Sequence, residues 1–425
     1  MAQDDIYKSK QKYEIFIDNL DRLLIPPSKA QHKRKYHCKN KANLAHFKTL
    51  HQEFETKDTS YVRRLRLFNV LIFVLHHTEK DISTLEREDV NQVVAKANRT
   101  FNSERTRVDF RKELRFLWKT LFFERDEKGL PDDTRIPYVV RHLKTRAERS
   151  RERGREDRLT LEEFEKLVIY FSKDPRLQAY LTLAFESLAR PQELLYLRIK
   201  DIQFYDDYAK IYVSQHGKEG TKLIQCIDSF LYVQRWFKIH PNRRSKDAYL
   251  FTTHGGNKQL TPYNINKMLR VACKNLGIDK RITCYSLKRN GVTFRRLRGE
   301  SDVEIQHAAG WTSTRQLSTY DMSTQEDVFL KRLVEKGKIS KDHPKYNQLV
   351  RENAFTEREC HFCKTKAPFT DELCPNVACG RPLDRTKLKQ QMESEGLISI
   401  KQMAKELLEN PTFLKMLKAN LNEGI

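Results

Sequence analysis

The chain has 425 residues, more than one hydrophobic core usually organises, so two or three domains are expected. Lysine and arginine total 80 against 57 aspartates and glutamates, and the net charge of +23 favours a nucleic acid as partner over general basicity. No apolar run approaches the roughly 20 residues of a membrane helix, and the first residues, MAQDDIYKSK, lack the apolar stretch of a secretory signal. The composition argues against a membrane-spanning or secreted protein and predicts an intracellular one.

The first part of the chain, residues 1–141, is expected to be mostly helical. Apolar residues recur at helical spacing in residues 62–75 and 108–122, and arginines and lysines stand between them. These segments are either ordinary helices with solvated basic faces or parts of a helical domain that lays positive charge on phosphates. The net charge of the chain favours the second interpretation, an N-terminal DNA-binding domain.

A basic linker and a new domain are expected next. Residues 142–158 (HLKTRAERSRERGREDR) contain almost no apolar side chain and cannot bury a face, which predicts an interdomain linker. Thr160 and Glu163 then fit the two positions of a capping box at the start of a helix. Further helices are predicted from Pro175 to about Arg190 and from Pro191 onward.

Two strand-like runs interrupt the helical pattern of this second domain. Residues 210–215 and 222–227 alternate in the manner of strands, and the turn between them contains two glycines. The following hundred residues return to a helical pattern. The sequence therefore predicts a mainly α (α+β) chain whose second domain, residues 159–335, consists of helices and a small β-hairpin.

Motifs in this second domain resemble, in order and spacing, those of the tyrosine recombinase (phage integrase) family. The stretch LARPQELLYL places Arg190 before a helix that begins with proline, as in the first arginine box. The hairpin turn in SQHGKEGTKLI offers Lys218, with Lys222 as a second candidate, for the family's hairpin lysine. Trp311 ends AAGW, at the family's Gly-His or Gly-Trp box, and Tyr320 in STRQLSTYDM falls where the family has its tyrosine. A helix–turn–helix is expected just before the tryptophan.

The chain departs from the family pattern in the box YSLKRNG. Tyr285 stands where the family usually has histidine or lysine, and the second arginine position falls on Lys288, with Arg289 directly after it. Either Lys288 replaces the arginine or Arg289 reaches the same phosphate. A lysine lacks the guanidinium group that can donate two parallel hydrogen bonds, so it would bind a phosphate more weakly.

The resemblance implies an enzyme that cuts and rejoins DNA strands through a covalent 3′-phosphotyrosine, with Tyr320 as nucleophile. Such chemistry needs charge neutralisation on the phosphate and an acid for the leaving oxygen, but no metal or cofactor. The implied roles are phosphate binding by Arg190 with Lys288 or Arg289, protonation of the 5′ oxygen by Lys218, and N–H donation by Trp311. The implied partners are double-stranded DNA with specific sites and further copies of the chain, as a tetramer on synapsed DNA, and the implied location is the nucleoid of the cytoplasm.

Each of these residues taken singly has a structural explanation. Tyr320 is then a surface tyrosine, Trp311 a core anchor, and the basic residues a plain DNA-binding face. The joint occurrence at the family's spacing favours a site-specific recombinase, for integration or excision of a mobile element or for dimer resolution. The alternatives are a non-catalytic DNA-binding protein on the same fold and a relaxing enzyme of the type IB topoisomerase kind.

A cysteine cluster follows the second domain and predicts a structural zinc site in residues 355–385. Two pairs of thiolates, the first a C-x2-C knuckle, can close a tetrahedral site and fold a module too small for its own core. The expected ligands are Cys360, Cys363, Cys374 and Cys379, with His361 less favoured. A zinc ribbon at this place resembles archaeal members of the recombinase family.

The tail, residues 386–425, is expected to be helical. Its apolar residues recur on one side, which suits packing against another protomer. They are Ile398, Ile400, Met403, Leu407 and Leu408.

Overall fold

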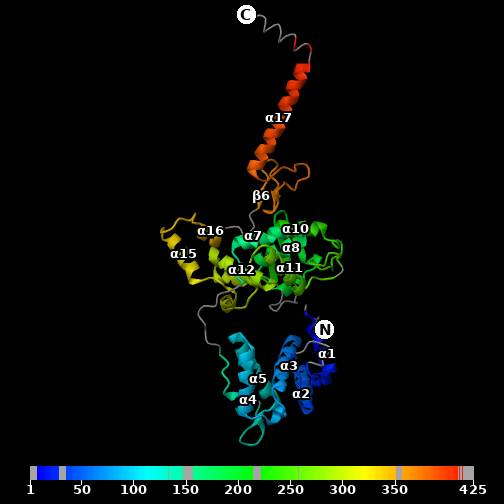
Figure 1. Cartoon of the computed structure of the whole chain (residues 1–425), viewed down its shortest axis with the longest axis vertical. Coiled ribbons are helices and arrows are strands. Elements are labelled where there is room, and N and C mark those ends of the chain that lie inside the picture. The colour runs from blue at the N-terminus through cyan, green and yellow to red at the C-terminus, as the bar shows by residue number, and fades with distance from the viewer. Residues whose placement is uncertain are drawn as a thin grey trace. The chain divides into compact units, whose positions relative to one another are not determined.

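The computed structural model describes residues 7–27, 35–132, 134–146, 157–213, 222–256, 258–350, 357–409, 411 and 414. The chain forms two compact units, residues 1–154 and 155–425, which are described separately (Figure 1). Most of the predicted linker and the hairpin turn that carries Lys218 lie outside the described residues. None of the described helices combines the length and apolarity that spanning a bilayer requires.

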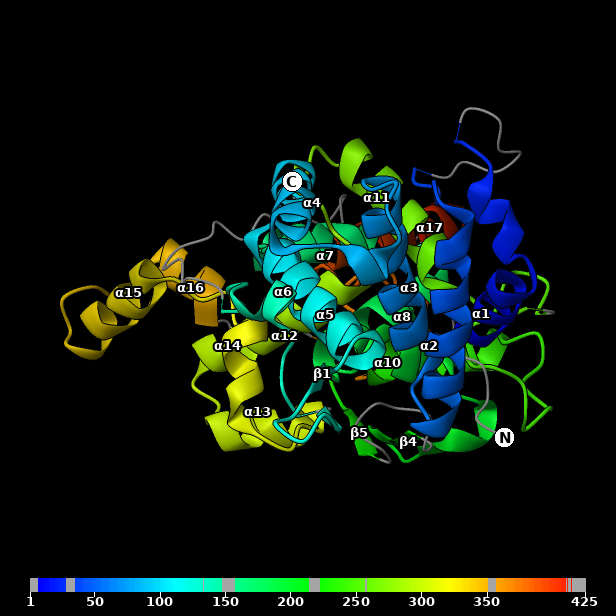
Figure 2. The same ribbon diagram turned by 90° about the horizontal axis from the view of Figure 1, so that it is seen from below.

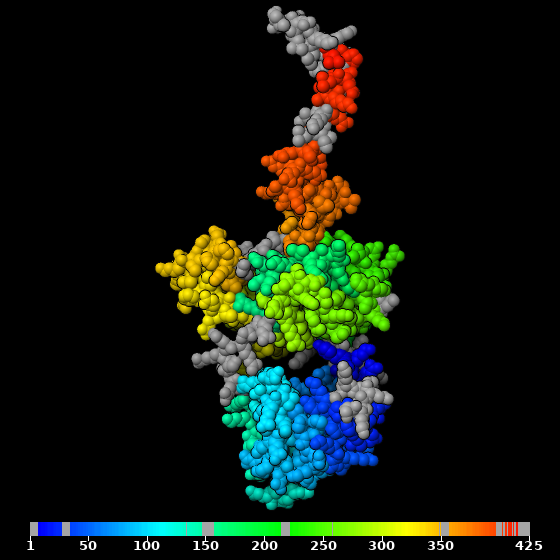
Figure 3. All heavy atoms as spheres, in the orientation of Figure 1, coloured from blue at the N-terminus to red at the C-terminus, as the bar shows by residue number. Residues whose placement is uncertain are grey.

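The first unit is a helical bundle around α3 (Tyr61–His76). The second half of α3 is almost entirely buried from Leu67 to Leu75, so this helix is stable only when other helices surround it. It packs against α1 (Ser9–Asp18) and α5 (Glu104–Leu121), and Figure 3 shows the unit as one compact body in blue and cyan. The remaining elements are α2 (Leu44–Thr56), α4 (Arg87–Thr100), α6 (Tyr138–Arg141), the 3₁₀ turns Leu20–Leu24, Lys41–Asn43 and Ile82–Thr84, and the antiparallel strands β1 (Glu124–Arg125) and β2 (Pro131–Asp132).

The predicted helical character of this first unit is confirmed. α5 is amphipathic, with its apolar side chains buried and its arginines and lysines facing outward or half-buried. The small β1–β2 hairpin was not expected, because strands of two residues leave no periodic pattern in the sequence.

The second unit is built around α8 (Pro175–Glu186), which is buried on all sides. It packs against α10 (Phe230–Ile239) and α12 (Cys284–Arg298). Gly291 permits the close approach of α12, because an added Cβ would lie 2.1 Å from the carbonyl oxygen of Phe185 in α8. The other helices of this part are α7 (Leu161–Tyr170), α9 (Pro191–Leu195), α11 (Pro262–Asn275), α13 (Asp302–Ala309), α14 (Leu317–Tyr320), α15 (Gln325–Glu335), α16 (Pro344–Val350) and the 3₁₀ turns Ile199–Asp201 and Thr314–Gln316.

The helix starts that the sequence predicts are confirmed. Thr160 accepts a hydrogen bond from the N–H of Glu163, whose side chain accepts one in return from Thr160. Pro175 and Pro191 each stand at the first turn of a helix, where the missing N–H costs nothing.

A three-stranded antiparallel sheet lies at the edge of this unit. Its order is β3 (Ile202–Phe204), β4 (Ala209–Val213) and β5 (Lys222–Cys226), with Ile211 opposite Ile224. Side chains alternate along β4, so that its first, third and fifth residues are buried. β4 and β5 correspond to the predicted hairpin, and the three-residue β3 was not expected. α13 packs against β5 and α12 (Figure 2).

The chain ends in a small cysteine-rich module and a helix. The module contains the antiparallel strands β6 (Arg358–Glu359) and β7 (Lys366–Ala367), and α17 (Arg385–Glu409) follows it. Arg235 of α10 forms an ion pair with Asp371, which fastens the module to the rest of the second unit. The predicted helical character of the tail is confirmed as far as Glu409, and Leu407 and Leu408 are exposed on it. Most of residues 410–425 lie outside the described residues.

Candidate active site

Arg190 stands at the junction between α8 and α9. Leu188, two residues earlier, has a φ of +52°, a left-handed conformation that costs a non-glycine residue energy and that turns the chain sharply. Arg190 is the residue before α9, and its N–H donates to the Glu193 side chain at 2.8 Å. Its side chain is only 12% exposed and donates to the same carboxylate at 3.2 Å. The turn and the cap together fix the direction of the guanidinium.

Glu193 is the buried anion of the site. Its carboxylate pairs with Arg190 and also with Lys222 Nζ at 3.0 Å. Burial by itself would raise the pKa of Glu193, but the Lys222 charge and the Arg190 N–H lower it below its usual value. This glutamate stands in the arginine box LARPQELLYL, and no role for it was predicted from the sequence. Its position three residues into a proline-initiated helix, where a carboxylate caps the helix, was the available signal.

Lys222 begins β5 and crosses to α13. Its side chain is 7% exposed, and Nζ donates to the carbonyl oxygen of Ala309 at 3.3 Å. The chain of methylenes lies over Gly310, where an added Cβ would come within 2.8 Å of Lys222 Cδ and where φ is +69°. Glycine at 310 therefore serves both the left-handed end of α13 and the passage of this lysine.

Trp311 and Tyr320 are stacked on each other. Their ring centroids are 5.2 Å apart at an interplanar angle of 28°. Trp311 is 4% exposed, and its buried indole N–H has no hydrogen-bond partner among the described residues. Tyr320 ends α14 and is half-buried against a cluster that includes Leu188 and Leu317. The site therefore holds an indole N–H donor beside a partly accessible phenol.

Lys288 lies beneath this aromatic pair. Its side chain is fully buried, and Nζ is 5.3 Å from the Trp311 ring centroid and 5.1 Å from that of Tyr320. Within the described chain, Nζ makes no hydrogen bond. Burial, reinforced by the nearby charges of Lys222 and Arg190, lowers the pKa of Lys288 to about 6. This amine is therefore largely neutral near pH 7.

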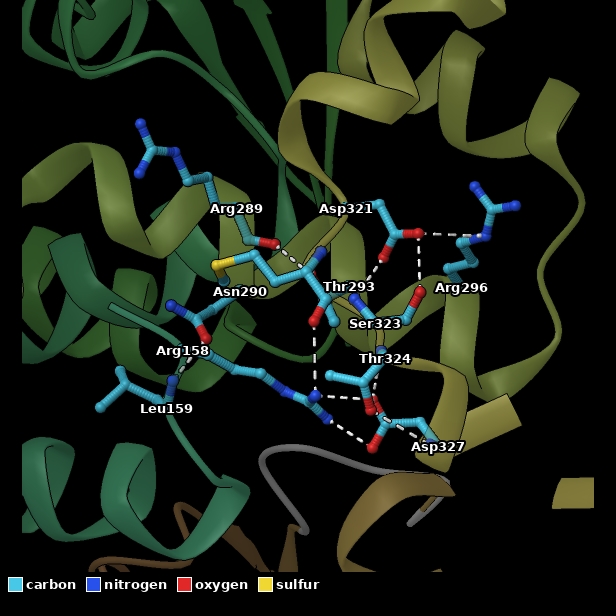
Figure 4. A network of polar contacts seen from close by, with 11 residues as sticks. Arg158, Leu159, Arg289, Asn290, Thr293, Arg296, Asp321, Ser323, Thr324 and Asp327 are labelled. Atoms are coloured by element: carbon cyan, nitrogen blue, oxygen red, sulfur yellow. Dashed lines mark hydrogen bonds and ion pairs between the residues drawn. The ribbon is translucent and has the colours of Figure 1, made fainter. Parts of the chain in front are cut away.

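The structure separates the two candidates for the second arginine position. Arg289 is 43% exposed and pairs with Asp157 at 2.8 Å, and in Figure 4 its side chain extends away from Asp321, the residue after the tyrosine. Tyr285, where the family usually has histidine or lysine, is 37% exposed at the start of α12. Lys218 lies outside the described residues. The structure thus gathers Arg190, Lys222, Lys288, Trp311 and Tyr320, and leaves Arg289 elsewhere.

The segment after Tyr320 is fixed to α12 by the polar network shown in Figure 4. The N–H of Met322 donates to the Thr293 hydroxyl at 2.8 Å, and Asp321 pairs with Arg296 at 3.4 Å. Because both partners belong to the same helix as Lys288, the tyrosine and the lysine are held by one element.

The four clustered cysteines lie together in the C-terminal module. Their sulfurs are all within 4.8 Å of one another, with Cys360 and Cys379 at 3.7 Å and Cys363 and Cys374 at 3.5 Å. Tetrahedral zinc–thiolate bonds of about 2.3 Å place sulfurs about 3.8 Å apart, so the arrangement fits a metal ion. The described residues around it form a core of only a few apolar side chains. The four thiols could therefore hold a structural metal.

The mainly helical second unit, with a short antiparallel sheet beside a stacked tryptophan and tyrosine, has the architecture of a tyrosine recombinase catalytic domain. Residues 157–327, which lie within this unit, match the phage integrase family. A comparison with curated proteins found no match.

Solved structures of low sequence identity share the fold. The XerH site-specific recombinase bound to palindromic difH substrate has a TM-score of 0.52 and 14% identity, over 78% of this chain and 97% of that one. The Tn1549 transposon integrase in complex with circular intermediate DNA has a TM-score of 0.51 and 12% identity, over 68% and 98%. A lambda integrase dimer bound to a COC' core site has a TM-score of 0.51 and 15% identity, over 65% and 76%.

Proposed function

We propose that the protein is a site-specific DNA recombinase that cuts and rejoins strands through a covalent 3′-phosphotyrosyl intermediate at Tyr320. The observation that carries the proposal is the presence beside that tyrosine of two buried donors, Lys288 Nζ and Trp311 Nε1, that have no partner among the described residues. A buried donor without a partner is costly, and such donors are kept where a ligand completes them. The phosphate of a DNA backbone supplies the missing acceptors.

The attacking oxygen and the phosphate-binding groups come from separate elements. The Tyr320 hydroxyl attacks phosphorus, and Arg190 and Trp311 donate to the non-bridging oxygens, where negative charge increases in the transition state. The phosphotyrosine retains the energy of the phosphodiester, so the strands are rejoined without a nucleotide cofactor. We assign the position of the second arginine to Lys288, which is buried beside Tyr320, and exclude Arg289, whose side chain is exposed and pairs with Asp157.

The leaving 5′ oxygen requires a proton, and we assign its donor to Lys218 in the hairpin turn. Lys222 has a different role, since its ammonium is already committed to Glu193 and to the carbonyl of Ala309. This lysine fixes the hairpin to α13 and adds positive charge next to the phosphate.

The partner proposed is double-stranded DNA, which the net charge of +23 and the DNA-bound recombinases of the same fold support. Strand exchange between two duplexes requires several active sites, so a tetramer on synapsed DNA follows from the reaction. We expect the protein at the nucleoid, where this substrate lies. Integration, excision and dimer resolution are all compatible with this chemistry.

We propose zinc as the metal of the C-terminal module, held by Cys360, Cys363, Cys374 and Cys379. Four thiolates prefer zinc over the harder divalent cations, and a closed set of four ligands is the pattern of a structural site. The ion would stabilise the module and, through the Arg235–Asp371 pair, its attachment to α10.

The test uses suicide DNA substrates with a nick next to the cleavage position, on sites that the protein is first shown to protect. Wild type is expected to give a covalent protein–DNA band on a denaturing gel, and Tyr320→Phe is expected to give none. Tyr285→Phe, an exposed tyrosine on α12, serves as the matched control and is expected to keep the band. Absence of a wild-type band on protected DNA would favour a non-catalytic DNA-binding protein.

A further inference from the structure

The reaction needs a group that accepts the Tyr320 proton, and the roles assigned above to Arg190, Trp311 and Lys218 are all those of donors. A phenol attacks phosphorus efficiently only if its proton leaves as the new bond forms. The residue three before Lys288, where the family pattern has histidine or lysine, is Tyr285. Its side chain is 37% exposed and carries neither an imidazole nor an amine.

We infer that Lys288 is the general base that takes the proton of the Tyr320 hydroxyl during cleavage and returns it during rejoining. This inference rests on the proposed recombinase function. It gives the lysine a role that an arginine at this position cannot fill, because a guanidinium does not lose its proton in proteins.

The surroundings of Lys288 favour this role. Its Nζ lies over the Tyr320 ring at 5.1 Å from the centroid, is fully buried, and has no acceptor among the described residues to hold its protons. The charged groups that face it are Arg190, the residue before α9, Glu193 of α9 and Lys222 of β5.

These neighbours decide the protonation state of the amine. Glu193 would stabilise the ammonium form, but it is already paired with two cations. Burial and the two cations outweigh it and lower the pKa of Lys288 to about 6, close to the working pH that suits a general base. In the protein without DNA, the amine is therefore largely without its extra proton near pH 7.

In the cleavage step, Tyr320, Lys288, Lys218 and the DNA phosphate account for every bond and proton that moves. The Tyr320 oxygen forms a bond to phosphorus while its proton moves to the lone pair of Lys288 Nζ. The bond between phosphorus and the 5′ oxygen breaks, and that oxygen takes a proton from Lys218. Rejoining reverses each transfer.

The transfer also produces charge where it is needed. Lys288 becomes an ammonium ion as negative charge increases on the phosphoryl oxygens. A cation that appears in the transition state stabilises it more than the bound substrate, which is the condition for acceleration. A permanent cation would bind the ground state as well.

The experiment measures single-turnover formation of the covalent complex between pH 5 and 9, with saturating suicide DNA. For wild type, the rate is expected to rise about tenfold per pH unit below the pKa of Lys288 in the DNA complex and to level off above it. Lys288→Arg is expected to be slower by about 10²-fold or more and to lose this inflection. Arg289→Lys, on the exposed side of the same helix, is the control and should keep the wild-type profile.

A second substrate separates this proton transfer from the one at the leaving oxygen. A 5′-bridging phosphorothiolate releases a thiolate, which needs no proton. The defect of Lys288→Arg should persist on it, whereas a variant that lacks the leaving-group acid should recover. Recovery of Lys288→Arg, or an unchanged pH profile, would overturn the inference.

Two further measurements distinguish the loss of the base from a packing defect and from the absence of recombinase activity. If arginine is too large for this buried position, Lys288→Met keeps the length of the side chain without a base, and it should fold, bind DNA and form no covalent complex between pH 5 and 9. A wild type that forms no covalent complex on protected DNA would contradict the recombinase function itself. A wild type that does, with a Lys288→Met variant that cleaves equally fast, would contradict only the role of Lys288.

Discussion

Arg158 and Asp327 form an ion pair that joins the beginning of the catalytic unit to the helix that follows the nucleophile. Nη1 and Nη2 of Arg158 lie 2.5 Å and 2.9 Å from the two carboxylate oxygens, and Nη1 also donates to the carbonyl of Met322 at 3.3 Å (Figure 4). Met322 is two residues after Tyr320. The pair therefore helps to fix the segment that carries the tyrosine, although its two members are 169 positions apart.

We expect Asp327→Asn to lower the free energy of unfolding of the catalytic unit by about 1–3 kcal/mol, because it leaves a half-buried guanidinium without its counterion. Burial by itself would raise the pKa of Asp327, but hydrogen bonds from Arg158 and Thr324 lower it below its unfolded value. A carboxyl group of this kind stabilises the fold above its unfolded pKa, about 4, and this contribution is lost as pH falls through the folded pKa.

Denaturant unfolding at several pH values checks this expectation. Wild type should lose stability as the pH drops below about 4, and Asp327→Asn should lose less over the same range. Asp247→Asn is the control, since Asp247 is 72% exposed in its pair with Lys200 and should contribute little. Equal pH dependence of wild type and Asp327→Asn would contradict the role of the pair.

Arg190 and Arg289 should differ sharply in their effect on cleavage. Arg190→Ala removes a phosphate donor, and a loss of about 10²–10³-fold in the rate of covalent complex formation is expected. Arg289→Ala removes only the ion pair with Asp157, so its cleavage rate should stay within a few-fold of wild type. Single-turnover cleavage of suicide DNA measures both. A comparable loss of cleavage rate in Arg289→Ala would show that Arg289 acts in the active site.

Lys218 and Lys222 should be separable by the chemistry of the leaving group. Lys218→Ala is expected to cleave an ordinary phosphodiester slowly and a 5′-bridging phosphorothiolate at close to the wild-type rate, because only the first substrate needs an acid. Lys222→Ala should be slow on both substrates, since the lost contacts to Glu193 and Ala309 hold the hairpin in place. The opposite pattern would assign the acid to Lys222.

Gly291→Ala should destabilise the catalytic unit, because the new methyl group would collide with the backbone of α8 rather than with a movable side chain. Overpacking of this kind costs about 1–3 kcal/mol, measured as a lower free energy of unfolding. Gly396→Ala in α17 is the matched control, since an added Cβ there meets nothing within 4 Å. That substitution should leave the catalytic unit unchanged and favour the helix by about 0.5–1 kcal/mol. A Gly291→Ala variant as stable as wild type would show that the two helices can separate freely.

Removal of the metal should unfold the C-terminal module. Cys363→Ser, or a strong chelator, is expected to abolish bound zinc, which elemental analysis would find at one ion per chain in wild type. Limited proteolysis should then cut residues 357–384, because the few apolar side chains of the module cannot hold it alone. Cys273→Ser, a buried cysteine of α11, should keep the zinc. If Cys363→Ser kept its full zinc content, Cys363 would not be a zinc ligand.

Features that depend on neighbours in the sequence were predictable from it. The capping box of Thr160 and Glu163, the helices that begin at Pro175 and Pro191, and the strands on either side of the hairpin turn all follow from local patterns. The cysteine spacing likewise pointed to a metal site, and the four sulfurs do come together. β3 was not predicted, because three residues are too few to show the alternation of buried and exposed side chains that marks a strand.

The resemblance of the motifs to those of the tyrosine recombinase family also suggested the chemistry of the site. The sequence could not choose between Lys288 and Arg289. Neighbouring residues on a helix point about 100° apart, and the side that faces Tyr320 is set by the packing of α12 on α8 at Gly291. Only the tertiary structure decided that Lys288 is buried under the aromatic pair and Arg289 is exposed. The reason is that the side of α12 that becomes buried depends on how the helices pack together, which the local sequence pattern does not show.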